Sequence, residues 1–378
     1  MKLTRKHIYH ITFSILILIC TIFIIISPST ILSSTRNSLL LWANIIVPSL
    51  FSFLVLSELL NITGINTVIG RILNPIMHPL FNLPGISSIA IVLGMTSGYP
   101  IGAKTTADLL KSNKISLEEA NHLISFTNNS GPLFISGAVG IGIYQNSSIA
   151  NLLLISHYTS AILVGILFRF LKNNSNEKVS LNETTIEIIN FSKIGSILGD
   201  IIKRSLSTLF MLGGFIVIFT VFTSILDSLG ILNYISQIFF PQLDSYTANS
   251  LLYGVLEVTT GVTRLASSNL SLFFKIILTS TLIGFGGLSV HLQTLNILSD
   301  TKISSSRYFL GKTLQAMFSA LITYLLLRYT TFSGVLTQAV FSTEVYNSDG
   351  FLNFISVIII CFLFCVFYKI WELLKEYN

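Results

Sequence analysis

The chain alternates between long apolar blocks and short polar stretches, and most of the blocks are long enough to cross a bilayer. A helix needs about 20 mostly apolar residues to span the hydrocarbon core. The first block, residues 8–26, follows Lys2, Arg5 and Lys6 and lacks an A-x-A cleavage site, so it predicts a retained helix with a cytosolic N-terminus. Further apolar segments are predicted near residues 39–60, 86–110, 120–144, 149–171, 205–228, 247–266, 271–298, 307–330 and 351–371.

Composition excludes a soluble protein. Only 10% of the residues are Asp, Glu, Lys or Arg, whereas a soluble domain carries about 25%. The hydrophobic fraction is 52% and the mean hydropathy is +0.77, so lipid is predicted to be the main solvent. A soluble enzyme, a nucleic-acid-binding module and a secreted disulfide scaffold are therefore excluded, and the lipid bilayer is the first expected partner.

Charge and cysteine usage add little chemistry. The formal net charge of +6 reflects membrane orientation, because the basic residues are concentrated in loops and at the termini. Cys20, Cys361 and Cys365 all lie in apolar runs and predict neither a disulfide framework nor a metal site. No Ser/His/Asp, Cys/His or three-ligand metal pattern is recognisable either. The sequence thus predicts no enzyme activity, no cofactor, no metal and no nucleic-acid partner.

Two apolar segments carry helix-breaking residues in their interior. Residues 94–110 read GMTSGYPIGAKTTADLL, and residues 126–137 read FTNNSGPLFISG. Glycine and proline at these places free backbone N–H and C=O groups at membrane depth. Such groups are tolerated only where the break is buried in protein or lines a wet cavity. Both segments are therefore predicted to be broken or re-entrant helices.

The second half of the chain repeats this plan more faintly. EVTTGVTRLA (257–266) aligns with GMTSGYPIGA (94–103), and GFGGLSV (284–290) aligns with NSGPLFI (129–135), so that Gly131 matches Gly286. If both termini and the Lys-rich linker lie in the cytosol, each half needs one re-entrant segment and the two repeats are inverted.

The predicted fold is an all-α polytopic membrane protein with about eight transmembrane helices plus re-entrant or broken helices in two inverted repeats. The expected divisions are an N-terminal transmembrane anchor (1–38), a first repeat (39–171), a polar cytosolic linker (172–204), a second repeat (205–330), and a C-terminal loop with a transmembrane helix (331–378).

The first break is the strongest candidate for a solute site. A half-helix that begins after a break presents unpaired N–H groups and the positive end of its dipole, which together attract anions. Lys104 would add a full charge in the first turn; alternatively, it lies beyond the membrane and its amino group reaches the surface. The candidate residues here are Ser97, Gly98, Tyr99, Pro100, Gly102 and Lys104.

The second break supplies neutral polar groups. Asn128, Asn129 and Ser130, followed by Gly131, could hydrogen-bond a solute or coordinate a cation. Equally, they could only satisfy the backbone groups that the neighbouring break sets free. Both tasks use the same residue types, so the sequence leaves the two readings open.

Charged residues also flank the fainter break of the second half. Arg264 would be the counterpart of Lys104, so that each half contributes one cation to the site. Glu257 is a candidate to bind a coupling proton or Na⁺; the alternative is a structural charge pair. Thr260, Gly261 and Gly286 complete the candidates in this half.

The motifs resemble those of a known family. GMTSGYPIGAK (94–104), SFTNNSGPLFISGAVG (125–140) and SHYTSAILVG (156–165) resemble the YlbJ-type sporulation integral membrane proteins. That family belongs to the wider group with nucleoside-recognition "gate" domains, so the two repeats would be gate-type repeats. The resemblance covers roughly residues 40–330. It implies a protein of the outer forespore membrane that passes dipicolinate from the mother cell toward the forespore.

The physical interpretation fits this implied task. A small planar dianion suits a site that offers two cations (Lys104 and Arg264), helix N-termini and amide donors. A carrier for another solute, such as a nucleoside, would instead predict uncharged residues at the breaks. A non-transporting membrane scaffold is disfavoured because long soluble docking domains are absent. The sequence leaves open whether the protein forms a homo-oligomer.

Overall fold

The computed structural model describes residues 5–63, 65–171 and 194–329, and these residues form helices and no strands. The predicted all-helical fold class is thereby confirmed. The first half contains α1 (Arg5–Ile26), α2 (Pro28–Leu41), η1 (Trp42–Ile46), α3 (Val47–Ile62), α4 (Ile65–Phe81), η2 (Gly85–Ser87), α5 (Ser88–Thr96), α6 (Ile101–Lys111), α7 (Leu117–Thr127), the π-helix η3 (Leu133–Ile143) and α8 (Ser147–Arg169). The second half contains α9 (Ile194–Ser228), α10 (Ile231–Phe239), α11 (Ser245–Leu256), α12 (Val258–Ala266), α13 (Leu272–Phe285), α14 (Gly287–Leu298) and α15 (Ser305–Tyr329).

The described residues contain enough long apolar helices for a multi-pass membrane protein. Four segments qualify as single spans: α8, α9, the α13–α14 segment and α15. Two bent pairs raise the number to as many as six, namely Ile17–Ile26 with Pro28–Asn44 at 102°, and Pro75–Phe81 with Gly85–Thr96 at 88°. The predicted count of about eight also included segment 351–371, which lies outside the described residues.

Several element boundaries differ from the predicted ones. The bend between α1 and α2 divides the predicted anchor (1–38) between two helices. Pro75 and Pro79 lie inside the 17-residue helix α4, which begins after the predicted segment 39–60. Helix α9 begins at Ile194, so residues 194–204 of the predicted linker are helical. The reason is that its buried positions recur with a helical period, at Ile201, Ser205, Leu209 and Leu212.

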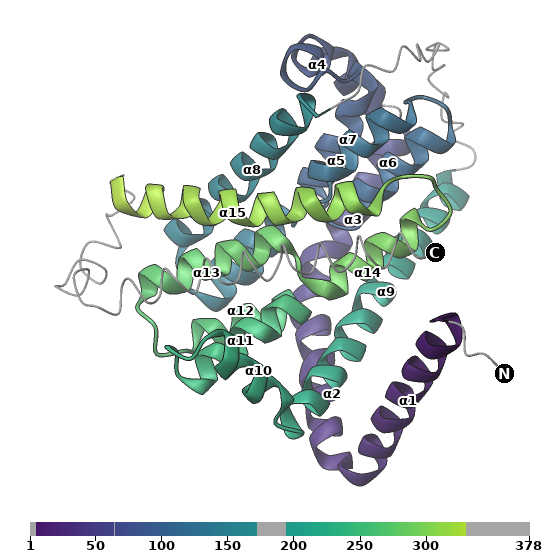
Figure 1. The fold of residues 1–378 in the computed structure, drawn as a ribbon. Coiled ribbons are helices and arrows are strands. Elements are labelled where there is room, and N and C mark those ends of the chain that lie inside the picture. The colour runs from purple at the N-terminus through teal and green to yellow at the C-terminus, as the bar shows by residue number, and fades with distance from the viewer. Residues whose placement is uncertain (1–4, 64, 172–193, 330–378) are drawn as a thin grey trace.

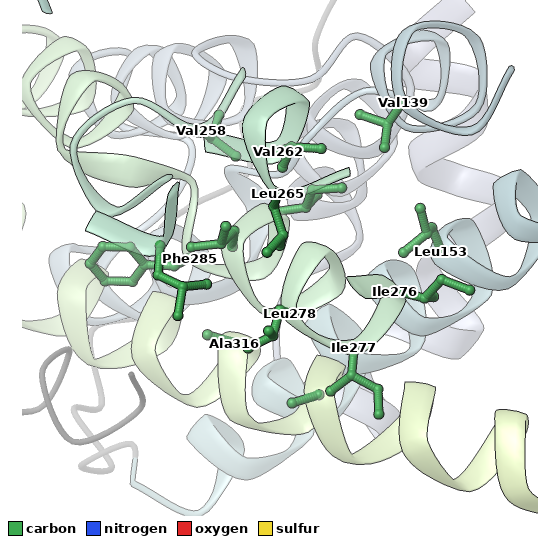
Figure 2. Close-up of a cluster of buried hydrophobic side chains, with 14 of the residues drawn as sticks. Val139, Leu153, Val258, Val262, Leu265, Ile276, Ile277, Leu278, Phe285 and Ala316 are labelled. Carbon is green, nitrogen blue, oxygen red and sulfur yellow. The ribbon is translucent and has the colours of Figure 1, made fainter. Parts of the chain in front are cut away.

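Helices α8 and α15 each contribute to both apolar clusters of the core and so connect the two halves. Helix α15 crosses the body against α7, α8 and α13, whereas α1 projects away beside α2 and α9 (Figure 1). One apolar cluster gathers α11, α12 and α13 with α8 and α15, and Figure 2 shows part of it. A second cluster gathers α4, α6 and α7, again with α8 and α15. Because lipid is as apolar as these side chains, close packing is what holds such helices together.

Candidate functional site

The two breaks of the first half cross each other with their glycines in contact. Residues 97–100 separate α5 from α6, and residues 128–132 separate α7 from η3. Gly98 has a φ of +81°, in the left-handed region that favours glycine. A Cβ atom on Gly98 would lie 2.6 Å from the backbone nitrogen of Gly131. No side chain therefore fits between the two breaks.

Glycines on either side of the first break bring α5 and α6 against the end of α7. Cβ atoms on Gly94 and Gly102 would lie 1.9 and 2.0 Å from the carbonyl oxygen of Thr127. Small residues that allow such backbone contact are typical of helix interfaces in membranes. Gly102, a predicted site residue, lies in this contact between helices.

The second half also contains a crossing of two broken helices, but its first break lies at Glu257. The backbone of Glu257 is extended and separates α11 from α12. Gly261, which the sequence alignment matched with Gly98, lies inside α12 and packs against Gly254 of α11, where a Cβ atom would lie 2.0 Å from the Gly254 Cα. The alignment rested on similar residue types in the two segments. The start of α12, however, is determined by the side chain of Glu257.

The other break of the second half lies at two glycines between α13 and α14. Gly286 and Gly287 have φ values of +94° and +79°. A Cβ atom on Gly287 would lie 3.1 Å from the backbone nitrogen of Val258 and 3.2 Å from the carbonyl oxygen of Gly254. The residue that contacts the break at Glu257 is thus Gly287, the neighbour of the predicted Gly286.

The carboxylate of Glu257 occupies the N-terminus of α12. Its two oxygens accept hydrogen bonds from the backbone N–H groups of Thr259 at 3.0 Å and Thr260 at 2.7 Å. Glu257 is 2% exposed, and none of the described Lys, Arg or His side chains lies within ion-pair distance of it. The positive end of this half-helix therefore already holds a carboxyl group, which the chain itself supplies.

A cavity lies where the breaks of the two halves meet, and we call it the central cavity. It has about 580 Å³ of empty space, part of which is open to solvent. No Lys or Arg of the described residues lines it, and no group of three described His, Cys, Asp or Glu side chains is placed to hold a metal ion. The polar residues and glycines of its wall are Ser97, Gly98, Tyr99, Gly131, Glu257, Thr259, Ser289 and Gln293, and its apolar residues are Ile46, Phe134, Leu212, Ile216, Val258 and Val290.

The amides of the second break are bonded mainly to the protein. Asn128 donates to the Thr294 hydroxyl at 2.8 Å, and the Asn129 side-chain oxygen accepts from Gln315 at 2.8 Å. Ser130 donates its backbone N–H to a buried histidine ring of α8 at 3.1 Å. These contacts connect the second break to α8, α14 and α15, while the side-chain oxygen of Asn128 has no hydrogen-bond partner among the described residues.

Sequence reasoning missed a buried lysine at this break. Lys312 of α15 is 1% exposed, and its amino group donates to the carbonyl oxygen of Asn128 at 3.1 Å and to the side-chain oxygen of Gln315 at 2.6 Å. It therefore lies at the C-terminal end of α7, where the helix dipole is negative. The available signal was a lysine inside the apolar segment 307–330, because ionisable residues within the membrane are functional candidates by default.

The structure does not bring the two predicted cations together at the central cavity. Lys104 has a side chain that is 45% exposed, and its amino group lies 3.6 Å from a carboxylate oxygen of Glu58. The guanidinium carbon of Arg264 lies 4.3 Å from the ring centre of Tyr253 and 4.9 Å from that of Tyr246. These cation–π contacts hold Arg264 against two tyrosines of α11. Neither cation lines the central cavity.

Comparison with known proteins defines first the class and then the family. A family model described as "Gate: Nucleoside recognition" matches residues 44–173, which contain both breaks of the first half. The helical fold and this match define a multi-pass membrane protein with a Gate domain. The sporulation integral membrane protein YlbJ of Bacillus subtilis (strain 168) is 35% identical over 328 residues, which cover 82% of this chain and 80% of that protein. The chain therefore belongs to the YlbJ family of sporulation integral membrane proteins, as the sequence motifs predicted. No solved structure matches it significantly.

Proposed function

We propose that this protein is a transporter that passes dipicolinate, a small aromatic dicarboxylate, across the outer forespore membrane during sporulation. The observation that carries the proposal is the central cavity itself, at which two pairs of broken helices meet. Discontinuous helices that meet near the middle of the bilayer are the usual construction of a transporter site. Leu212 and Ile216 of the cavity wall lie near the middle of the 35-residue helix α9, which agrees with such a depth.

Glu257 determines how a carboxylate solute would be received. While it is ionised, Glu257 fills the N-terminus of α12 and repels a second anion. Once Glu257 binds a proton, the N–H groups of Thr259 and Thr260 become available to a carboxylate of the solute. Exchange of one carboxylate for another at the same N–H groups would couple uptake of the anion to uptake of a proton.

Uptake by the purified protein tests the proposal. We expect vesicles that contain the protein to accumulate radiolabelled dipicolinate faster than protein-free vesicles, and an excess of unlabelled dipicolinate to compete. Absence of uptake by correctly folded protein, under both inward and outward proton gradients, would contradict a transport function and leave the membrane scaffold.

Glu257→Gln tests the coupling role. Glutamine retains one oxygen that can accept from the α12 N–H groups, but it cannot exchange a proton. We expect uptake of dipicolinate to persist while its stimulation by an inward proton gradient disappears. Asp244→Asn is the matched control, because Asp244 caps α11 through the Thr247 N–H at 3.0 Å and lies outside the central cavity. Equal gradient dependence in wild type and Glu257→Gln would exclude Glu257 as the coupling residue.

A neutral solute such as a nucleoside is a second candidate. It is favoured by the lack of Lys and Arg among the described residues that line the central cavity, and by the description of the matching Gate model. The two candidates separate in one competition experiment. If the solute is a dicarboxylate, an excess of nucleoside should leave dipicolinate uptake unchanged. If the second candidate is correct, the nucleoside itself should be taken up.

A further inference from the structure

A second cavity, which we call the charged pocket, lies between α3, the α5–α6 pair and α9. It has about 610 Å³ of empty space, part of which is open to solvent. Its apolar wall is formed by Leu54, Leu93 and Ile101, and the other residues that line it are Glu58, Lys104, Thr105, Asp108, Arg204, Ser205 and Thr208. The pocket thus gathers two cations and two carboxylates from three helices.

One carboxylate lies between the two cations of the pocket. The amino group of Lys104 lies 3.6 Å from one oxygen of Glu58, and a guanidinium nitrogen of Arg204 lies 4.0 Å from the other. Both distances exceed the roughly 2.7–2.9 Å of a charge-assisted hydrogen bond. The side chains of Lys104 and Arg204 are 45% and 61% exposed, and ion pairs of this exposure contribute only about 0–1 kcal/mol each. A better placed carboxylate could therefore compete with Glu58 for the two cations.

A buried hydroxyl of the pocket wall has no hydrogen-bond partner. Ser205 is 1% exposed, and its hydroxyl oxygen is among the buried polar atoms without a partner in the described residues. Buried polar groups are otherwise nearly always hydrogen-bonded, so an unpaired one calls for an explanation. A solute oxygen in the charged pocket would supply the missing partner.

The charged pocket and the central cavity lie along the same helices. Helix α9 lines the charged pocket through Thr208 and the central cavity through Leu212, which is four residues, or about 6 Å, further along. The α5–α6 pair likewise lines the central cavity through Gly98 and the charged pocket through Ile101. The two cavities therefore follow one another along the contact between α9 and the α5–α6 pair.

We propose that the charged pocket is the loading site for the carboxylate solute, and that Glu58 is an internal carboxylate which the solute displaces from Lys104 and Arg204. The inference rests on the proposed transport of a dicarboxylate and assigns its recognition to a site other than the central cavity. Lys104 and Arg204 come from α6 and α9, so two cations from different helices can bind the two carboxylates of one solute. The central cavity, which no described lysine or arginine lines, then receives the solute in the next step.

Binding and uptake of dipicolinate by vesicles containing the full chain test this assignment. Lys104→Gln and Arg204→Gln should each raise the KM and the Kd at least about tenfold, equivalent to about 1.4 kcal/mol, with little change in the maximal rate. Lys104→Arg should retain most of the affinity, because it keeps the charge. Glu58→Gln should bind dipicolinate more tightly than wild type, because the internal competitor is gone. The loss in Arg204→Gln should be smaller for pyridine-2-carboxylate, which carries one carboxylate.

Lys203→Gln is the matched control, because Lys203 is an exposed neighbour of Arg204 on α9 that does not line the pocket. Its KM should equal that of wild type. If the Glu58 ion pairs serve only stability, Glu58→Gln and Lys104→Gln will lower the Tm while the KM stays unchanged, and the loading site is refuted although transport stands. If the wild type neither binds nor takes up dipicolinate, the proposed function and this inference both fail.

Discussion

Replacing Gly98 with leucine is expected to abolish uptake while the protein still accumulates in the membrane. The φ of +81° at Gly98 costs a residue with a side chain about 1–2 kcal/mol. The larger effect is steric, because the Cβ atom would lie 2.6 Å from the backbone nitrogen of Gly131 and neither backbone can yield without moving its break. Ser97 and Tyr99 on the wall of the central cavity would move with it. Uptake per amount of folded protein, judged by gel filtration, measures the effect.

Gly214→Leu is the control for this substitution. Gly214 lies on α9 with nothing within 4 Å of a Cβ atom, so leucine there should leave uptake at the wild-type level. The smaller variant Gly98→Ala should already impair uptake, because the close contact begins at the Cβ atom. Wild-type uptake in Gly98→Leu at normal abundance would show that this break does not lie on the path of the solute.

Lys312→Met is expected to lower the free energy of unfolding by about 2–5 kcal/mol. The substitution leaves the Asn128 carbonyl and the Gln315 side-chain oxygen without their donor, and each buried unpaired group costs about 1–3 kcal/mol. Methionine also avoids the cost of burying an ammonium group. That relief is smaller here, because the negative end of α7 and two oxygens already stabilise the charge. Thermal unfolding in detergent measures the change.

Lys302→Met provides the comparison for Lys312→Met. Lys302 is exposed in the loop before α15, so its substitution should change the Tm little. If Lys312→Met unfolds at the wild-type temperature or above, the lysine does not hold α15 to the second break of the first half, and its burial needs a functional explanation instead.

The breaks of the first half could be predicted because their causes are local. Glycine and proline interrupt a helix wherever they occur in such a cluster, and a chain of this hydropathy must enclose the freed backbone groups. The first break of the second half has a different cause. There a carboxylate caps α12 through N–H groups two and three residues further on, a pattern that the alignment of Gly261 with Gly98 concealed.

Predicting the site failed where it depended on which helices lie side by side. Lys104 and Arg264 are both basic residues near a break, yet one points to Glu58 and the other lies over two tyrosine rings. The cation that faces the same pocket as Lys104 is Arg204, a residue of the predicted linker that forms part of α9. No spacing along the chain relates the two, since they are 100 residues apart and meet only through packing.

The sequence by itself determined the membrane environment, the helical class, the breaks of the first half and the family. These follow from apolar run length, from glycine and proline, and from local motifs, each of which acts within a few residues. The tertiary structure alone decided that Glu257 fills a helix N-terminus at the central cavity, that Lys312 binds the end of α7, and that Arg204 joins Lys104 around Glu58. The physical reason is that charges and unpaired backbone groups in a membrane must find partners, and only packing of distant helices determines which partners are within reach.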